Sequence, residues 1–295
     1  TGPSGDDRIY RHADLLDSVP SDVAAVDTNG DDVLDRIVVG DSGGNIWRAD
    51  LTGRDTGDWK LSLMARLGRH AAAGKNNDRR FFHEPDIVQT KDANGAYDAI
   101  LIESGDRADP LDKGGVTENW LYMIRDNAIG VGTAADRVTA HDDLTDITSV
   151  DCGAADIPEA CGNLVNGWRI RLAATGEKGL AAPLTFRNVV FFTTYVPQSA
   201  AGSCAPSEGV GNLYAVRLGD GAPVFREFDS DSSDLDLEDR VQRLASAGIP
   251  AQVVYVSGPS DRTILRPDLK FGEAPGSNRF RGFWRRGESP PRDAP

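Results

Sequence analysis

Short runs of β-forming residues, separated by turns rich in Gly, Asp and Asn, recur along most of the 295-residue chain and limit its fold more than any other feature. Runs of Val, Ile, Leu and aromatic residues bounded by such turns are typical of strands, and few segments show helical periodicity. The clearest runs are 36–39, 99–102, 120–124, 189–195, 212–217 and 252–256. Many short strands at close intervals predict an all-β domain, either a sandwich or a propeller.

Internal similarity favours the propeller. The segment Asp27-Thr-Asn-Gly-Asp-Asp-Val-Leu-Asp35, which a strand follows, has a shorter copy in Asp92-Ala-Asn-Gly-Ala-Tyr-Asp98, which a strand also follows. A second set, 44–53, 118–126 and 211–221, places an aromatic residue in a strand that ends in a polar turn. Units repeated at several tens of residues are typical of propeller blades. We therefore expect a modified β-propeller, with an irregular β-sandwich as the alternative.

Two segments depart from this pattern. The acidic segment 229–240 leads into a predicted short helix over 239–246, which Gly248 and Pro250 would end. The last residues, 287–295, include three prolines and are predicted to be a disordered tail.

The overall charge excludes one class of partner. The chain has 46 acidic residues against 32 Lys and Arg, and its formal charge of -14 would repel a nucleic-acid backbone. No stretch approaches the roughly 18 consecutive apolar residues of a membrane-spanning helix, so we expect no direct membrane span. The first residue is Thr, not Met, which leads us to expect a segment of a longer protein. The acidity suits exposure to millimolar calcium outside the cell.

The segment 27–35 has the spacing of a calcium-binding loop. Calcium takes six to eight oxygen ligands, and linear calcium loops supply them from alternate residues. Here Asp27, Asn29, Asp31 and Asp35 occupy positions 1, 3, 5 and 9 of the loop, and the backbone carbonyl of Val33 serves at position 7. The sequence therefore predicts a calcium site made of these five residues.

The loop differs from an EF-hand in three ways. Position 6 is Asp32 where an EF-hand has Gly, position 12 is Val38 where it has Glu, and a strand follows where it has a helix. Gly30 at position 4 is free to adopt a positive φ and bend the chain. Asp35 must then take the place of the terminal glutamate.

Four carboxylates in nine residues repel one another by about 0.8 kcal/mol per pair at about 5 Å, even in bulk water. A cation would remove this repulsion and stabilise the ordered loop. The alternative is an ordinary Asp/Asn/Gly-rich turn that binds nothing. The shorter copy (92–98) has Ala96 where the third ligand would lie, and we predict that it binds no metal.

The three cysteines include one pair suited to a disulfide. Cys152 and Cys161 flank an irregular Gly/Ala/Asp/Pro-rich stretch that a short bridge would close, and we predict that bridge. Three reduced thiols are the alternative. Cys204 is left without a partner in either case, or pairs outside this chain.

Other candidate sites are weak, and we predict no catalytic residues. His12, His70, His83 and His141 lack metal-ligand spacing, and no nucleophile elbow, phosphate-binding loop or dinucleotide fingerprint is present. Two basic and aromatic segments, 79–82 and 281–286, resemble nucleic-acid patches. Given the net charge, we expect them to pack within the protein by cation–π and blade contacts.

A family resemblance extends along nearly the whole chain. It is carried first by Val26-Asp-Thr-Asn-Gly-Asp-Asp-Val-Leu-Asp35, which leads through Val-Gly-Asp41 to Gly44-Asn-Ile-Trp-Arg-Ala-Asp-Leu51. Further matching segments are 79–86, 103–107, 167–172 with Gly-Glu-Lys178, 192–197 with Cys204, 239–240 with 248–250, and Phe283-Trp-Arg-Arg286. Together these motifs resemble the C-terminal domain of the PilY/PilC type IV pilus tip adhesins.

The resemblance implies a modified β-propeller at the bacterial cell surface, at or near the tip of the pilus (fimbrium) and associated with the outer membrane. It implies a non-enzymatic role in pilus assembly, extension and retraction, surface adhesion and twitching motility. Partners would be pilins or minor pilins and a host-surface receptor, and the calcium loop would be a control element. Because the family's domain has several blades before this loop, we expect residues 1–286 to form part of a propeller.

Two other functions remain open at this stage. Quinoprotein-type dehydrogenases are also propellers with calcium and tryptophan-containing repeats, but likeness of fold is a weak basis for assigning activity. The adjacent-cysteine disulfide of that class has no counterpart here, since eight residues separate Cys152 from Cys161. The ion would alternatively be a structural staple in a surface protein, without a regulatory role.

Overall fold

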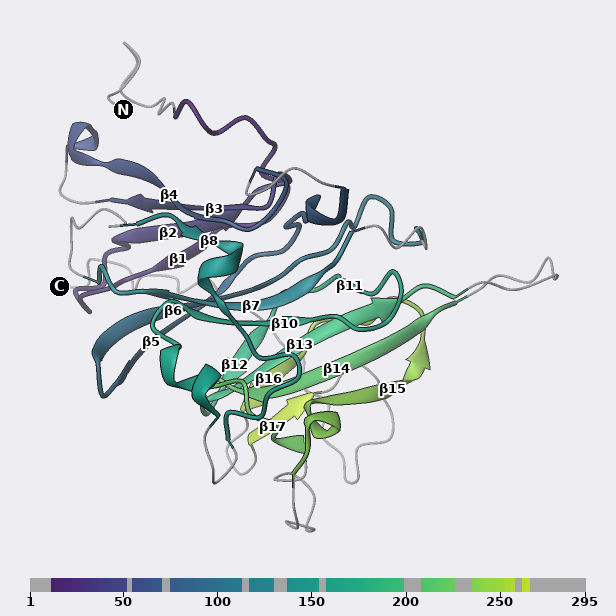
Figure 1. The fold of residues 1–295 in the computed structure, drawn as a ribbon. Coiled ribbons are helices and arrows are strands. Elements are labelled where there is room, and N and C mark those ends of the chain that lie inside the picture. Colours follow the sequence, from purple (N-terminus) through teal and green to yellow (C-terminus); the bar gives the residue numbers. More distant parts are fainter. Residues whose placement is uncertain are drawn as a thin grey trace, which may run out of the picture.

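The structure is a computed structural model that describes residues 12–51, 55–70, 75–112, 117–129, 137–153, 158–198, 208–225, 235–257 and 262–265. Regular structure within these ranges consists of strands and short 3-10 helices (Figure 1). The 3-10 helices are η1 (Thr56–Asp58), η2 (Lys75–Asn77), η3 (His141–Asp143), η4 (Glu159–Asn163) and η6 (Leu237–Arg240). No helix in the described ranges is long and apolar enough to cross a bilayer.

Within the described ranges, the strands form three five-stranded sheets and one hairpin. The first sheet has the order β1 (Ala24–Val26), β2 (Arg36–Gly40), β3 (Asn45–Asp50), β4 (Lys60–Arg66) and β8 (Thr139–Ala140). The middle sheet has the order β5 (Asp86–Asp92), β6 (Gly95–Glu103), β7 (Trp120–Asp126), β10 (Gly167–Arg171) and β9 (Thr145–Asp146). The third sheet contains β11 (Lys178–Gly179), β12 (Leu184–Phe186), β13 (Val189–Val196), β14 (Val210–Arg217) and β15 (Val241–Ala247). The hairpin joins β16 (Val254–Ser257) to β17 (Arg262–Leu265).

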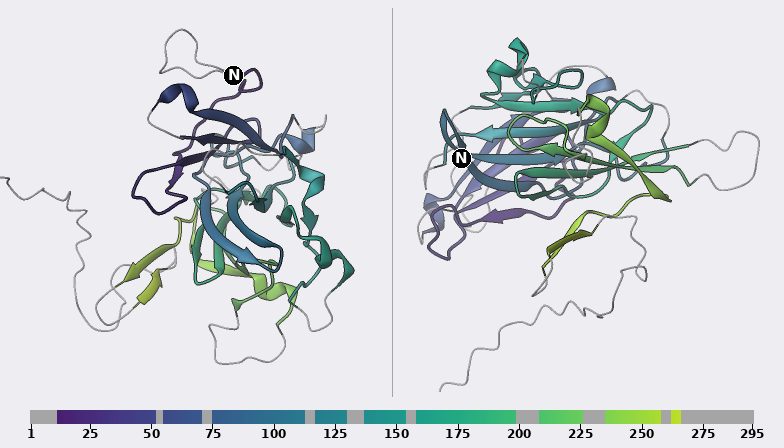
Figure 2. Two further views of the ribbon diagram at one scale, coloured as in Figure 1. Left: turned by 90° about the vertical axis from the view of Figure 1, so that its left-hand side faces the viewer. Right: turned by 90° about the horizontal axis from the view of Figure 1, so that it is seen from below.

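The three sheets lie in succession, with the middle sheet covered on both faces (Figures 1 and 2). Successive side chains of a strand point to opposite faces. In β6, Ile100 and Ile102 therefore pack against the first sheet, and Ala99 and Leu101 pack against the third. This is why the middle strands are continuous apolar runs instead of alternating polar and apolar residues.

Strand positions were predictable from the sequence. The six predicted runs overlap β2, β6, β7, β13, β14 and β16, with bounds that differ by up to four residues. Most neighbouring strands in the described sheets pair antiparallel. In the pair β2 and β3, for example, Arg36 lies opposite Asp50 and Gly40 lies opposite Ile46. Residues 281–286, the tail 287–295 and Cys204 lie outside the described residues.

The predicted helix over 239–246 is wrong. Asp236 caps the single 3-10 turn η6 by accepting a hydrogen bond from the Glu238 N–H (2.9 Å), and the chain then continues directly as β15. β15 pairs antiparallel with β14, with Gln242 opposite Leu213. Ladder hydrogen bonds to an otherwise unpaired strand edge outweigh a weak local preference for helix.

The predicted disulfide between Cys152 and Cys161 is present, with the two Cα atoms 5.5 Å apart. Both cysteines are buried in the core between the middle and third sheets. The bridge holds η4 against this core, close to β9. An irregular connection is thereby fixed in a region that strand pairing does not organise.

Glu103, at the end of β6, is buried where the middle sheet meets the third. Its Oε1 accepts a hydrogen bond from the Ala181 N–H (2.9 Å), and its Oε2 has no partner among the described residues. Burial raises the pKa of Glu103 well above its usual value; the Ala181 N–H lowers it, and the nearby charge of Glu177 raises it. The folded protein therefore binds a proton at Glu103 more tightly than the unfolded chain does.

This difference predicts a pH dependence of stability. Because the folded pKa is raised, the contribution of Glu103 to the free energy of unfolding should be highest below the ordinary carboxyl pKa of about 4.3 and fall as pH rises toward the folded value. We expect Glu103→Gln to flatten this decline in urea unfolding measured between pH 4 and pH 8. The exposed Glu208→Gln is the matched control and should keep the wild-type slope. An unchanged slope in Glu103→Gln would show that Glu103 does not titrate as described.

Candidate metal centre

The predicted calcium loop is the nine-residue connection of a hairpin between β1 and β2. Val26 pairs with Arg36 at its base, and the Asp35 N–H donates to the Val26 carbonyl (3.0 Å). The Asp35 carbonyl in turn accepts from the Leu51 N–H (2.7 Å) at the end of β3. Both ends of the loop are thus fixed to the first sheet.

Asp27, at position 1, folds the first half of the loop around its own carboxylate. Oδ1 accepts hydrogen bonds from the N–H groups of Gly30 (2.7 Å) and Asn29 (3.1 Å), and Oδ2 accepts from Asp32 (2.8 Å). Desolvation is the largest single influence and raises the pKa of Asp27, but the backbone N–H bonds together lower it below its usual value. The carboxylate therefore stays ionised within the coil.

The side chains at positions 3 and 5 repeat this pattern. Asn29 Oδ1 accepts from the Asp31 N–H (2.8 Å), and Asp31 Oδ1 accepts from the Val33 N–H (2.9 Å). Positive φ angles of 78° at Gly30 and 67° at Asp32 turn the backbone between these contacts. Gly and Asp are among the residues that most readily adopt this conformation. The oxygens at positions 1, 3 and 5 are directed toward the backbone of one compact coil.

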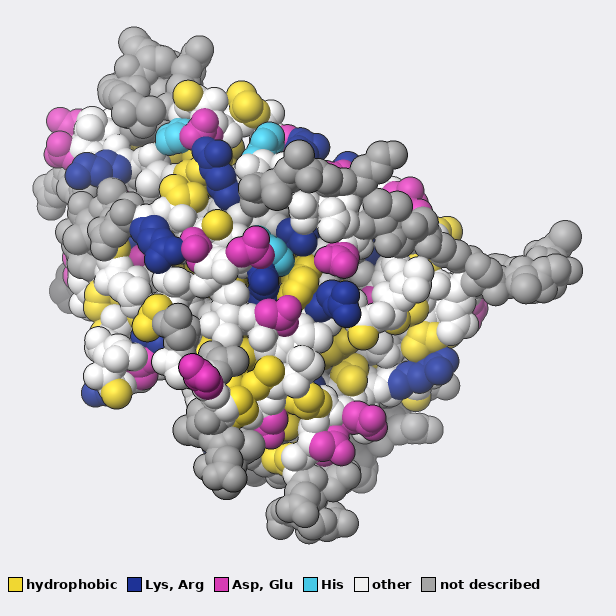
Figure 3. All heavy atoms as spheres, viewed as in Figure 1, with side chains coloured by type: hydrophobic (Ala, Val, Ile, Leu, Met, Phe, Trp, Pro, Cys, Tyr) yellow, Lys and Arg dark blue, Asp and Glu magenta, His cyan; other side chains and the backbone are white. Residues whose placement is uncertain are grey.

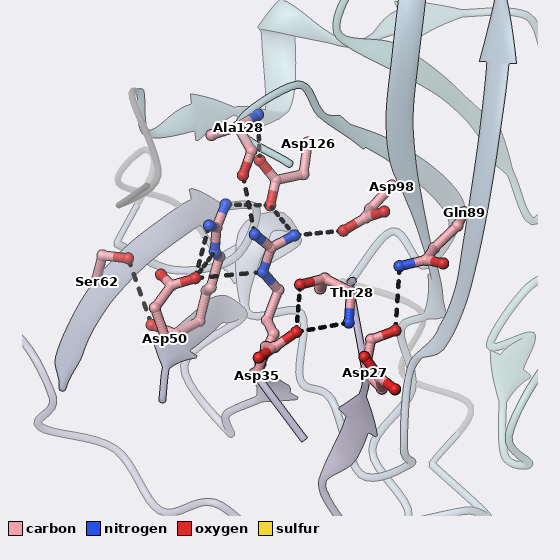
Figure 4. Close-up of polar contacts among 11 residues, drawn as sticks. Asp27, Thr28, Asp35, Asp50, Ser62, Gln89, Asp98, Asp126 and Ala128 are labelled. Carbon is pink, nitrogen blue, oxygen red and sulfur yellow. Dashed lines mark hydrogen bonds and ion pairs between the residues drawn. The ribbon is translucent and has the colours of Figure 1, made fainter. Parts of the chain in front are cut away.

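Asp35, at position 9, faces Thr28 (Figure 4). Its Oδ2 accepts from the Thr28 N–H (2.9 Å) and from Thr28 Oγ1 (2.7 Å), and the residue is only 7% exposed. From β5, the Gln89 side chain donates to the Asp27 carbonyl (3.5 Å). The sequence analysis did not identify Thr28 or Gln89 as contacts of the loop. Thr28 lies within the loop and its hydroxyl group is a sequence signal for such a contact. Gln89 is distant in sequence, and no local pattern indicates its contact with the loop.

The residue types suit calcium, but the structure does not gather all the predicted ligands. Asp27, Asn29 and Asp31 lie in one coil, while the carboxylate of Asp35 is held by Thr28. Among the described residues, no group of three or more His, Cys, Asp or Glu side chains is placed to hold a metal ion. Calcium binding by Asp27, Asn29, Asp31, Val33 and Asp35 stays a prediction.

The shorter copy (92–98) differs from the loop in shape and in charge. It forms a tight turn between β5 and β6, with Asp92 paired to Gly95. Asp92 forms an ion pair with Arg125 (2.5 Å), and Asp98 forms one with Arg36. No Lys or Arg among the described residues pairs with any of the four aspartates of the loop. The copy is thus internally neutralised, and the loop keeps its charge.

Five buried charged residues lie directly behind the loop and join the first sheet to the middle one (Figure 4). This inter-sheet ion cluster consists of Arg36, Arg48, Asp50, Asp98 and Asp126. Arg48 pairs with Asp126 (2.5 Å) and Asp50 (2.7 Å), and Arg36 pairs with Asp98 and with Asp50 (3.3 Å). Because Arg36 directly follows Asp35, the loop ends inside this cluster.

The cluster holds two cations and three carboxylates, all sealed from solvent. Burial raises the pKa of Asp98, while the charge of Arg36 lowers it and the charge of Asp126 raises it. Buried charges of this kind are tolerated only when paired and hydrogen-bonded. The first and middle sheets are therefore held in one relative position by ion pairs as well as by apolar packing.

The four histidines and the first basic segment contact neighbouring parts of the protein. Arg79 and Phe81 are buried, so the prediction that segment 79–82 packs within the protein is confirmed. Each histidine contacts a neighbouring side chain: the pairs are His12 with Trp47, His70 with Asp17, His83 with Arg107, and His141 with Tyr122. Burial is the main cause that lowers the pKa of His83 to about 4.

Comparisons with known proteins agree with the resemblance seen in the sequence. No protein-family model matches the chain. It is 27% identical over 212 residues to the type IV pilus biogenesis factor PilY1 homolog of Xylella fastidiosa, which covers 69% of this chain and 14% of the relative. The crystal structure of the Pseudomonas aeruginosa PilY1 C-terminal domain is similar with a TM-score of 0.59 and 15% identity, over 83% of this chain and 58% of that one.

The chain thus spans about a seventh of the length of the relative that it matches in sequence, and somewhat more than half of the solved domain. The structural likeness confirms the all-β, propeller-like fold class. The relative in sequence is a PilY1 homolog, and the solved domain is also that of a PilY1 protein. The chain therefore has the fold of the PilY1 C-terminal domain and resembles a PilY1 homolog in its sequence.

Proposed function

We propose that this chain is the calcium-binding, non-enzymatic part of a bacterial type IV pilus protein at the cell surface. The observation that carries the proposal is the likeness to a type IV pilus biogenesis factor over 212 residues. The matching fold of a PilY1 C-terminal domain supports it. Within that role we propose action in pilus assembly, in the balance of extension and retraction, in surface adhesion and in twitching motility.

Calcium would be held by the carboxylates of Asp27, Asp31 and Asp35, the Asn29 amide oxygen and the Val33 carbonyl. It would supply positive charge to four aspartates that lack a described cationic partner. The shape of the loop comes from the chain itself. Gly30 and Asp32 bend the coil, and the strands β1 and β2 fix its ends. A loop ordered in this way presents one defined surface to a pilin, a minor pilin or a host receptor.

Two alleles of the full-length protein in its own bacterium test this proposal. Asp31→Asn removes a charged ligand, and Asp32→Asn removes the same charge from a position that holds no predicted ligand. Asn also tolerates the positive φ of residue 32. We expect Asp31→Asn to change surface piliation and reduce the twitching zone while Asp32→Asn matches wild type, with equal protein levels in both strains.

The outcomes separate three possibilities. If deletion of the gene leaves pili and twitching unchanged, the pilus function is rejected. If deletion abolishes them but Asp31→Asn and Asp32→Asn are both normal, the protein acts in the pilus without calcium control. If Asp31→Asn lowers only the amount of folded protein, the ion is a structural staple.

A further inference from the structure

A polar cavity of about 520 Å³ opens on the middle sheet, away from the calcium loop. It lies where the start of β7 meets β10 and η3, and Trp120 and Arg169 form part of its lining. On the face shown in Figure 3, basic, acidic and histidine side chains gather around apolar ones near the centre. None of the predicted calcium ligands lines this cavity.

The inner part of the cavity is positively charged. The guanidinium carbon of Arg169 lies 4.9 Å from the centroid of the Trp120 ring, and that of Arg79 lies 5.9 Å from it. Arg79 is 2% exposed, and its hydrogen bonds go to two backbone carbonyls and to Asn77 Oδ1. No described carboxylate forms an ion pair with it. A buried guanidinium without a counter-ion is costly and favours a nearby anion.

Two further observations indicate that the inner cavity favours an anion or another hydrogen-bond acceptor. Trp120 Nε1 and Arg169 Nε are buried N–H donors with no hydrogen-bond partner among the described residues. Such unsatisfied donors are rare in folded proteins. His141 also lines the cavity, and burial, followed by the charges of Arg79 and Arg169, lowers its pKa to about 3. The imidazole is therefore neutral at physiological pH.

The cavity lining also includes three carboxylates, those of Glu118, Asp142 and Asp146. Asp142 pairs with Arg169 (2.9 Å) and its side chain is 89% exposed; Glu118 lies 3.7 Å from Arg171, and these two side chains are 42% and 51% exposed. Glu118 and Arg171 are both about half exposed, and such a pair contributes little free energy, so an incoming anion can replace it. Asp142 is exposed although its partner Arg169 is only 13% exposed, and its carboxylate, like that of Glu118, lines the cavity as a hydrogen-bond acceptor.

We propose that this cavity binds a carboxylate-bearing saccharide unit, with the carboxylate on Arg169 and Arg171 and hydroxyl groups on Glu118 and Asp142. A volume of about 520 Å³ lies within the usual range of small-ligand sites. An acidic peptide would satisfy the arginines, but it supplies no hydroxyl donors for the carboxylates of the cavity lining. A saccharide supplies both one anion and several hydroxyl donors. The proposal requires neither calcium in the loop nor the pilus function.

Titration calorimetry of the 295-residue chain, with a chelator present so that the calcium loop cannot contribute, tests this inference. The probes are trigalacturonate, 3′-sialyllactose, the neutral maltotriose and the acidic peptide triglutamate. We expect at least one acidic saccharide to bind, with maltotriose and triglutamate at least tenfold weaker. Whichever acidic saccharide binds identifies the source as a polyuronate or a sialylated glycan.

Substitutions locate the binding. Arg171→Ala should weaken it by about tenfold, because a hydrogen bond to a charged group is lost, and Arg171→Lys should retain part of it. Arg66→Ala, which removes another exposed arginine on the first sheet, should leave the affinity unchanged. The inference is overturned if neither acidic saccharide binds, if maltotriose or triglutamate binds equally well, or if Arg171→Ala matches Arg66→Ala.

Discussion

Saturating calcium is expected to raise the melting temperature of the chain, and Asp31→Asn is expected to abolish most of that rise. A ligand that binds only the folded state at about 100 times its dissociation constant adds about 2.7 kcal/mol of stability. For a domain of this size class that corresponds to an increase of about 5–10 °C. The physical cause is the neutralisation of four aspartates that have no cationic partner in the described structure.

The measurement is a thermal melt monitored by circular dichroism, in the presence of calcium or of a chelator. Asp32→Asn provides the matched control. It removes the same charge as Asp31→Asn from the same loop, at a residue with a positive φ of 67° that Asn also tolerates. We expect Asp32→Asn to keep most of the calcium effect. Equal responses in the two variants would mean that general charge relief, and not a site with defined ligands, explains the stabilisation.

The largest loss of stability is expected from breaking the inter-sheet ion cluster. Arg36→Met removes the guanidinium that contacts Asp98 and Asp50 and leaves buried carboxylates without it. Deleting one partner of a buried ion pair typically costs about 3–5 kcal/mol. Urea unfolding monitored by tryptophan fluorescence would measure the change in the free energy of unfolding.

A second substitution distinguishes charge from packing. Adding Asp98→Asn to Arg36→Met restores the net charge of the cluster, and we expect the double variant to lose less stability than the two single effects combined. Arg66→Ala, which breaks the exposed pair with Asp14, should cost less than about 1 kcal/mol. Strict additivity of Arg36→Met and Asp98→Asn would contradict direct coupling.

The strands were predictable because each is a local pattern of apolar residues between turn residues. The connection 27–35 between β1 and β2 was predictable in position for the same reason, since its turn residues lie within nine positions; calcium binding there stays a prediction. The sequence did not indicate that the Asp35 carboxylate would accept a hydrogen bond from Thr28 and not lie beside the carboxylates of Asp27 and Asp31. That choice depends on the rotamer that Asp35 adopts at the base of the hairpin.

Features that depend on distant pairing were not predictable. Segment 239–246 has apolar residues spaced as in a helix, but the free edge of β14 determines its conformation. The inter-sheet ion cluster joins Arg36 to Asp98, which are 62 positions apart, and nothing in either local sequence indicates the pairing. The polar cavity likewise draws Arg79, Trp120 and Arg169 from separate segments.

The two-sided burial of β6 sets a rule for the insertions and deletions that this domain can accept. Shifting β6 by one residue would turn Ile100 and Ile102 toward the third sheet, and Ala99 and Leu101 toward the first. Both cores would then be filled with side chains of the wrong size at the same time. Changes of even length preserve which face each side chain occupies, so natural length variation is expected at the 92–95 turn and not within the strand.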